Sequence, residues 1–295
     1  MHTNIGRRRP GSIGRMLCGL LALGCILPDA AAAGDRLTAT GGVTELEGAG
    51  GGGITPWALI AGLGTDREIG GSVACTDVSP RDFTLRACGA NVGFYNRLEL
   101  SVGEQTLQLG STAPGREIRL TTLGAKWRLV GDAVIDQDRW WPQVALGVQW
   151  KHNRDFDEIP RAIGAQRATG TDVYLAATKI YLDGIAGRSW VVDVTLRETE
   201  ANQLGLLGFG GDRGTFRLVA EGSVGAFLTD TLLVGAEYRQ KPDNLSAFRE
   251  NAFCDLFMAW FPWKYVSLTV AWAELGRIAD KASEQGPYVS LQGTW

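Results

Sequence analysis

The 295-residue sequence has few of the side chains from which enzymes build active sites. It contains two histidines, and one of them, His2, lies in a segment that we expect to be removed. The other, His152, has no serine motif to work with, since Glu221-Gly222-Ser223-Val224-Gly225 lacks the G-x-S-x-G spacing. The glycine cluster at residues 48–53 is not followed by the Lys-Ser or Lys-Thr pair of a phosphate loop. These absences predict a protein that is not an enzyme, with no catalytic residue and no cofactor.

A metal site is not predicted either. Asp155, Asp157 and Glu158 form an acidic cluster, and oxygen ligands at alternate positions can hold Ca²⁺ or Mg²⁺. A complete calcium-loop pattern is missing, however, so we expect these carboxylates to be solvated.

Cysteine is scarce, with five residues of which two precede residue 34. The others are Cys75, Cys88 and Cys254. Cys75 and Cys88 flank a predicted turn at residues 79–81, so they could face each other across a hairpin and form a disulfide. Unpaired cysteines at these positions are the open alternative.

The chain also lacks a basic excess and, beyond its start, any long apolar run. The 29 basic and 32 acidic residues include four Arg and one Asp before residue 34, which leaves 25 against 31 and argues against nucleic-acid binding. The start reads as a cleaved signal peptide over residues 1–33. Its basic residues Arg7, Arg8, Arg9 and Arg15 precede an apolar run at 16–27, and Ala31-Ala32-Ala33 offers the cleavage site.

What the chain does have is glycine, tryptophan and alternation. Gly occurs 40 times and Trp ten times. From about residue 68 to the end, apolar and polar side chains alternate with a period of two, as in residues 143–151, 190–197, 216–228 and 266–273. A soluble β-sandwich alternates too. The segments, however, have the roughly 9 to 11 residues that a tilted strand needs to cross a bilayer, and tryptophans lie near their ends.

The last ten residues continue this alternation up to Trp295. A closed barrel must pair its last strand with its first so that no edge is left in lipid. Val289, Leu291 and Trp295 are therefore expected on the lipid side of a final strand, as the signal read by the barrel assembly machinery. The fold predicted is all-β, a transmembrane antiparallel up-and-down β-barrel in the outer membrane of a Gram-negative bacterium.

Connection lengths predict about twelve strands over a barrel of residues 67–295. Long segments at 274–286, 240–251, 198–214, 152–170 and 108–116 alternate with short ones at 263–265, 229–231, 183–188, 130–139 and 95–97, as outer loops and periplasmic turns should. Residues 34–66 are glycine-rich, and 57–62 do not alternate. We expect this segment to be a plug or cap, whereas an extra hairpin would make fourteen strands.

One short turn predicts a register. With residues 229–231 as the loop, Leu228 pairs with Leu232 and Glu221 pairs with Arg239 inside the barrel. A slip of two residues would instead place Glu221 against Glu237.

A family resemblance agrees with this fold. Residues 40–52, which run Thr-Gly-Gly-Val-Thr-Glu-Leu-Glu-Gly-Ala-Gly-Gly-Gly, then Thr55-Pro56-Trp57-Ala58-Leu59-Ile60 and the stretch from Gly89 through Asn96-Arg97-Leu98-Glu99-Leu100 resemble a proteobacterial family catalogued as domain of unknown function 3034. The resemblance spans essentially the whole chain after residue 33. It implies an outer-membrane β-barrel and no known activity, so no functional residue is carried over.

Function therefore rests on the expected lumen, where charges of both signs mix. The predicted lumen-lining residues are Glu99, Lys126, Arg128, Lys151, Lys179, Asp193, Arg197, Arg217, Glu221, Glu237, Arg239 and Asp255. We expect a narrow channel or transporter for small polar solutes, with outer-membrane lipids around it. The alternative is a non-transporting envelope protein with a structural, assembly or surface-binding role. A lipid-modifying enzyme is the more remote alternative.

Overall fold

A computed structural model describes residues 34–295, so the predicted signal peptide lies outside the described residues. Within that part of the chain no helix is long and apolar enough to cross a membrane. Residues 34–295 form fourteen strands, one short α-helix and two 3-10 turns. The strands are β1 (Val43–Thr44), β2 (Gly50–Gly51), β3 (Ile69–Val78), β4 (Thr84–Phe94), β5 (Leu98–Gln108), β6 (Glu117–Val130), β7 (Gln143–Asn153), β8 (Thr169–Tyr181), β9 (Trp190–Thr199), β10 (Arg217–Thr229), β11 (Leu232–Arg239), β12 (Phe253–Trp263), β13 (Val266–Ile278) and β14 (Lys281–Thr294). The remaining elements are α2 (Ile159–Ala162), η2 (Ile185–Gly187) and η3 (Asn202–Gly205).

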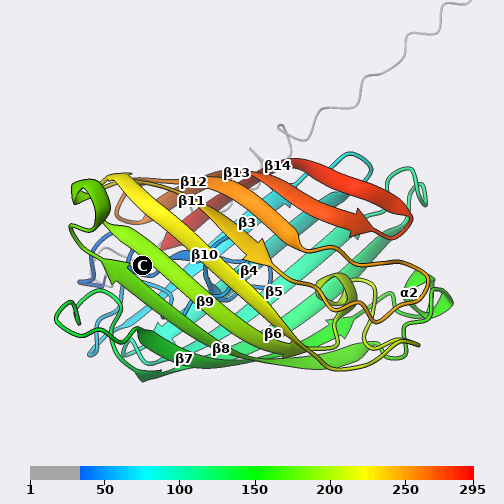
Figure 1. Cartoon of the computed structure of the whole chain (residues 1–295), viewed down its shortest axis with the longest axis horizontal. Helices are drawn as coiled ribbons and strands as arrows, with labels where there is room; N and C mark the ends of the chain where they lie inside the picture. Colours follow the sequence, from blue (N-terminus) through cyan, green and yellow to red (C-terminus); the bar gives the residue numbers. More distant parts are fainter. Residues whose placement is uncertain (1–33) are drawn as a thin grey trace, which may run out of the picture. The chain divides into compact units, whose positions relative to one another are not determined.

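Strands β3 to β14 form a closed barrel (Figure 1). Each strand pairs antiparallel with the next along the chain, and β14 pairs with β3 to close the ring through residues such as Leu291 opposite Cys75. The prediction of a twelve-strand up-and-down barrel is thereby confirmed. Closure pairs the first strand of the wall with the last and leaves neither as an open edge, which is what a strand structure in lipid requires.

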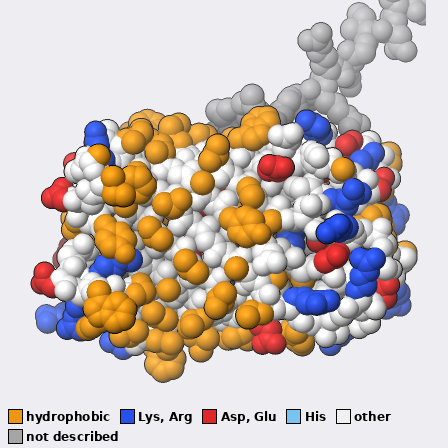
Figure 2. Space-filling view, viewed as in Figure 1, with side chains coloured by type: hydrophobic (Ala, Val, Ile, Leu, Met, Phe, Trp, Pro, Cys, Tyr) orange, Lys and Arg blue, Asp and Glu red, His pale blue; other side chains and the backbone are white. Residues whose placement is uncertain are grey.

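The outer face of the barrel carries an apolar belt. Leu100, Leu175, Val194, Leu256 and Trp272 are each more than a third exposed on it. Figure 2 shows apolar side chains spread over the middle of this face, with charged side chains gathered toward its two ends. Alternation produces the belt because successive side chains of a strand point to opposite faces.

The two ends of the barrel differ in their connections. The short-turn end holds connections 95–97, 131–142, 182–189, 230–231 and 264–265, together with the start of β3 and the end of β14. The long-loop end holds connections 79–83, 109–116, 154–168, 200–216, 240–252 and 279–280.

This order is the predicted one except in the last hairpin. There β13 and β14 continue past the belt to a turn at residues 279–280, so the long loop expected at 274–286 is mostly strand. The strands extend because Leu275 and Ile278 are buried against the apolar core at that end.

The predicted register between β10 and β11 is confirmed along most of the hairpin. Val224 lies opposite Ala236, and Glu221 lies opposite Arg239 with Oε1 of the glutamate 3.4 Å from Nε of the arginine. Only the turn differs, because an irregularity between residues 227 and 229 pairs Leu232 with Thr229 instead of Leu228.

Residues 34–64 lie inside the barrel rather than in its wall. Their two short strands, β1 and β2, pair only with each other, so the fourteen-strand alternative is wrong. Nearly every residue from 40 to 64 is buried, and in Figure 1 this segment winds through the lumen. We call residues 34–64 the plug.

At the long-loop end the two faces of the wall exchange character. Leu107, Ile118 and Leu120 point inward and are 4% exposed or less, whereas Glu104 and Arg119 on the outside are solvent-exposed. This part of the barrel therefore projects beyond the apolar belt and has an apolar interior of its own.

Candidate functional site

The plug enters and leaves the lumen at the same end of the barrel. The amide of Arg36 donates to the carbonyl of Leu63 at 3.1 Å, and its guanidinium donates to the carbonyl of Ile60 at 2.9 Å. The amide of Leu63 in turn donates to the main-chain oxygen of Trp295 at 2.9 Å, beside the end of β14. The plug is therefore a loop whose two ends, which we call its roots, are hydrogen-bonded to each other at the short-turn end of the barrel.

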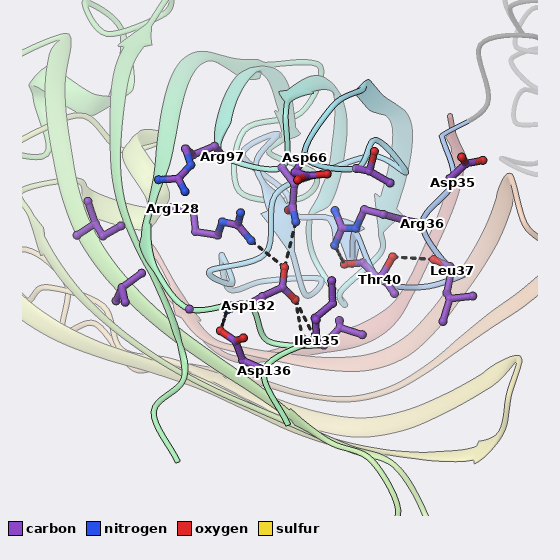
Figure 3. A pocket seen from close by; sticks show the side chains of 16 residues that line it. Asp35, Arg36, Leu37, Thr40, Asp66, Arg97, Arg128, Asp132, Ile135 and Asp136 are labelled. Atoms are coloured by element: carbon purple, nitrogen blue, oxygen red, sulfur yellow. Dashed lines mark hydrogen bonds and ion pairs between the residues drawn. The ribbon is translucent and has the colours of Figure 1, made fainter. Parts of the chain in front are cut away.

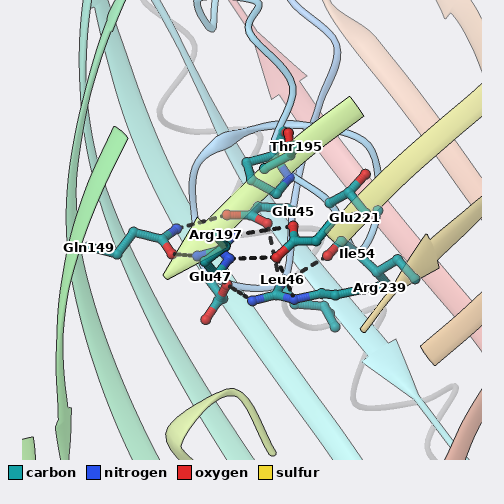
Figure 4. Close-up of polar contacts among 12 residues, drawn as sticks. Glu45, Leu46, Glu47, Ile54, Gln149, Thr195, Arg197, Glu221 and Arg239 are labelled. Atoms are coloured by element: carbon teal, nitrogen blue, oxygen red, sulfur yellow. Dashed lines mark hydrogen bonds and ion pairs between the residues drawn. The ribbon is translucent and has the colours of Figure 1, made fainter. Parts of the chain in front are cut away.

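Two plug carboxylates meet the basic side chains of the wall at the middle of the lumen (Figure 4). Glu47 is fully buried and contacts Lys151 closely, Nη2 of Arg239 at 2.6 Å and Nη1 of Arg197 at 3.8 Å. Glu45 accepts a hydrogen bond from Gln149 at 2.9 Å. We call this group the ionic centre.

Wall carboxylates complete the ionic centre and bind its cations from the other side. Asp172 lies 2.6 Å from Nζ of Lys151 and 3.3 Å from Nη1 of Arg197. Glu221 lies 2.5 Å from Nε of Arg197 and 3.4 Å from Nε of Arg239. Each basic side chain thus has at least two acidic neighbours, which offsets the cost of removing its charge from water.

Another wall carboxylate, Glu237, holds the glycine stretch of the plug through main-chain amides. Glu237 accepts hydrogen bonds from the amides of Gly53 at 2.7 Å and Ile54 at 3.0 Å, and from the hydroxyl of Thr55 at 2.7 Å. A Cβ on Gly52 would come within 1.8 Å of Oε1 of Glu237, so a larger residue there would displace this contact. Close approach to the wall is therefore a reason for the glycine cluster.

The pair Glu99 and Lys126 binds the plug in a similar way. Glu99 accepts from the amides of Gly50 at 2.9 Å and Ala61 at 2.8 Å, while Nζ of Lys126 donates to the carbonyl of Gly50 at 2.7 Å. The two side chains are 3.0 Å apart and 1% exposed. An acid and a base from neighbouring strands thus satisfy donors and acceptors of the plug together.

Eleven of the twelve predicted lumen-lining residues lie on the inner face. Glu99, Lys126, Lys151, Asp193, Arg197, Glu221, Glu237, Arg239 and Asp255 are buried there, Arg128 lies at the short-turn mouth, and Arg217 is exposed at the long-loop rim. Lys179 was misassigned. It is paired with outward-facing Val192 and covered by the 131–142 connection, to whose carbonyl at Asp136 its Nζ donates at 2.6 Å.

The sequence gives little sign of the plug's partners. Glu45, Glu47 and Asp172 belong to the ionic centre, but none was predicted as a site residue. For Asp172 the signal was available, because it alternates with outward Val173 and Thr171 in β8. For the two glutamates, nothing in residues 40–52 specifies that they face basic side chains more than 100 positions away.

The long-loop end of the lumen is closed by an apolar core. The 200–216 connection folds inward and places Leu204, Leu207 and Phe209 against Leu107 and Leu120 of the wall. Phe209 is fully buried. Leu46 and Ile54 of the plug also belong to this core.

A cavity of about 620 Å³ opens beneath the plug at the short-turn end (Figure 3). Asp132 stands in its wall and accepts from Nη1 of Arg128 at 2.7 Å and from the amides of Val134 and Ile135 at 3.0 Å. Burial opposes ionisation of this carboxyl, but the two amides and the guanidinium outweigh it and lower its pKa. The carboxylate therefore fixes the 131–142 connection beside the roots of the plug.

The other predicted positions lie away from the lumen. Cys75 and Cys88 face each other in β3 and β4 and form a disulfide with a Cα separation of 4.1 Å, while Cys254 is a free, exposed cysteine. Val289 and Leu291 lie on the outer face of β14. That these two residues and Trp295 act as an assembly signal stays a prediction.

The residues considered for catalysis or metal binding, His152 in β7 and three acidic residues in the loop that follows, all contact neighbouring side chains. The ring of His152 stacks on Trp150. The three acidic residues that could suggest a cation site contact three different arginines, in the pairs Asp155 with Arg119, Asp157 with Arg161 and Glu158 with Arg116.

An apolar belt outside a closed strand barrel and a buried plug inside it define a plugged β-barrel of the outer-membrane type. The chain belongs to the family described as "Protein of unknown function (DUF3034)", whose model matches residues 40–292. The resemblance noted in the sequence is thereby confirmed. Among curated proteins no match is found.

Solved structures with a similar fold are outer-membrane barrels. A KdgM porin is 10% identical, with 76% of this chain and 99% of that chain covered and a TM-score of 0.48. Omp33 of Acinetobacter baumannii is 11% identical, with 77% and 96% covered and a TM-score of 0.42. An outer membrane channel of Pseudomonas putida F1 is 11% identical, with 81% and 96% covered and a TM-score of 0.37.

Proposed function

We propose that this protein is an outer-membrane channel or transporter for small polar solutes, closed by its plug in the state described. In this proposal the short-turn end faces the periplasm and the long-loop end faces outward. The plug then enters from the periplasm and can be withdrawn to the same side without breaking a pair of barrel strands.

The observation that carries the proposal is the contrast between the two fillings of one barrel. Where the long-loop end is filled, the wall is apolar, with Leu107 and Ile118 in its core. Where the plug sits, the wall has an apolar patch around Phe257 and Phe261, against which Trp57 packs. It also presents the charged side chains Lys126, Arg197 and Glu237 to the plug. Buried ion pairs are a poor way to stabilise a permanent core, because desolvation offsets much of their attraction. Such a wall becomes useful when the plug leaves and water and polar solutes replace it.

A disulfide across the plug contact provides the test. Oγ1 of Thr55 in the plug and Oγ of Ser223 in the wall are 2.6 Å apart. We expect a T55C/S223C variant, made in a C254S background, to be silent in planar bilayers when oxidised and to conduct when reduced. The matched control is T76C/S290C, whose hydroxyls are 2.8 Å apart but join two wall strands. Its conductance should not respond to reductant.

The second candidate is a non-transporting envelope protein. The apolar core beneath the 200–216 connection favours it, because this core closes the outward end and includes Leu46 and Ile54 of the plug, which ties the plug to a permanent apolar filling. A plug deletion separates the two. Gly41 and Gly62 have their backbones in contact, so removal of residues 42–61 joins positions that already touch. If this variant, the reduced T55C/S223C variant and the intact protein are all silent in bilayers, the channel proposal is wrong and the second candidate stands.

A further inference from the structure

The barrel wall has a cleft where β10 and β11 separate at the long-loop end. Strand β10 pairs with β9 from Arg217 onward, but its pairing with β11 begins only at Glu221. Just before Glu221, a single hydrogen bond runs from the amide of Gln240 to the carbonyl of Ala220. Residues 217–219 therefore have a strand neighbour on one side only. Pro242 follows closely on β11, and proline cannot donate to a strand ladder, which accounts for the early end of the pairing.

The cleft holds a guanidinium without an acidic partner among the described residues. Its volume is about 450 Å³, and Arg213, Arg217 and Lys241 line it with Asp243. Arg217 is exposed, and its hydrogen bond goes to the main-chain oxygen of Arg213 at 3.3 Å. Arg213 lies 3.6 Å from Asp243.

The remaining charged groups near the cleft leave its balance positive. Lys241 turns inward, where it pairs with Glu250 at 3.0 Å in a buried contact. Glu198, which lies opposite Leu218 in β9, is exposed on the outer face. The positive charge left in the cleft is thus that of Arg217, together with the part of the Arg213 charge that Asp243 does not offset.

Apolar side chains flank this charge at the edge of the lipid belt. Leu218 is 71% exposed and Phe216 is 50% exposed. Further toward the middle of the belt, Leu196 and Tyr238 are exposed on the neighbouring strands. The cleft therefore lies at the long-loop edge of the apolar belt, with Leu218 on its outer face and Arg217 at the rim of its inner face.

We propose that this cleft binds the phosphorylated headgroup of a lipid of the outer leaflet, with the phosphate on Arg217 and Arg213 and an acyl chain along Leu218. Arginine suits this role because its planar fork of donors matches phosphate oxygens. The proposal rests on the outer-membrane placement and is independent of whether the lumen conducts.

Binding of defined probes to the delipidated, detergent-purified barrel tests the proposal. The probes are diphosphoryl lipid A, the same lipid without phosphate, and inorganic phosphate, with bound copies counted by native mass spectrometry and affinities measured by titration. We expect diphosphoryl lipid A to bind at least about tenfold more tightly than either other probe, because only it offers both charge and chain.

Three variants locate the site. R217Q should lower the affinity for diphosphoryl lipid A by about tenfold or more. L218N should lower this affinity less, and R116Q should leave it unchanged. Arg116 is the matched control because it is exposed at the same end but paired with Glu158 at 2.6 Å. The proposal is overturned if R217Q binds the lipid as the parent does, if R116Q weakens it equally, or if inorganic phosphate binds as tightly as the lipid.

Discussion

The ionic centre makes a quantitative prediction for the substitution Glu47→Gln. Glu47 is fully buried and joins the plug to Lys151 and Arg239 of the wall. Removal of its charge does not strand those cations, because Lys151 keeps Asp172 at 2.6 Å and Arg239 keeps Glu221 at 3.4 Å. The inserted plug then loses only the free energy of the Glu47 hydrogen bonds to charged groups and of the attraction between the Glu47 carboxylate and the cations of the wall. We take it as about 2–4 kcal/mol.

Such a loss raises the ratio of withdrawn to inserted plug by about 30- to 1,000-fold, at about 1.4 kcal/mol per factor of ten. Thr55 faces the wall and is fully buried, so a cysteine at this position reacts with a maleimide only when the plug is out. With T55C and C254S as the parent, we expect E47Q to raise the labelling rate by that factor, provided that the plug exchanges faster than it is labelled.

The control for this experiment is Glu104→Gln. Glu104 is half-exposed on the outer wall and pairs with Arg154 at 2.5 Å. Exposed pairs contribute at most about 1 kcal/mol, and this one does not touch the plug. E104Q should therefore change the labelling rate less than about twofold. Equal rates for E47Q and its parent, or equal acceleration by E104Q, would show that the ionic centre does not hold the plug.

The remaining predictions concern the ends of the barrel and its disulfide. Phe209→Ala should cost about 3–5 kcal/mol in the apolar core, and limited proteolysis should then cut the 200–216 connection. C75S/C88S should lower the free energy of unfolding in urea by about 3 kcal/mol, since a bridge over 13 residues restricts the unfolded chain. The lowered pKa of Asp132 means that its contribution is complete above the ordinary value of 3.8 and is lost as pH falls through the folded value. Hydrogen exchange of residues 131–142, corrected for intrinsic rates, should show this acid-dependent loss in the intact protein and not in D132N.

Much of the wall was predictable because its signals are local. Leu196, Leu218 and Leu256 each belong to a series of outward residues at every second position of their strands. A period of two assigns such a series to one face without information from the rest of the chain. The position of the short turn likewise predicted that Glu221 lies opposite Arg239, although the loop is one residue shorter than predicted and an irregularity offsets the difference. Lys179 is the exception. Its charge suggests the lumen, but it lies in phase with outward Val173 and Leu175 of β8, and the 131–142 connection covers it on the outer face.

The sequence by itself determined the barrel, its twelve strands, the apolar belt and the presence of a segment that does not belong to the wall. Only the tertiary structure decided what fills the lumen. Glu47 reaches Arg239 across 192 positions, and Gly53 reaches Glu237 across 184. Contacts at such separations leave no periodicity in the sequence, because they depend on where closure of the whole ring places each strand. The exchange of apolar and polar faces at the long-loop end has the same origin, because burial there comes from the inward-folded 200–216 connection and not from lipid.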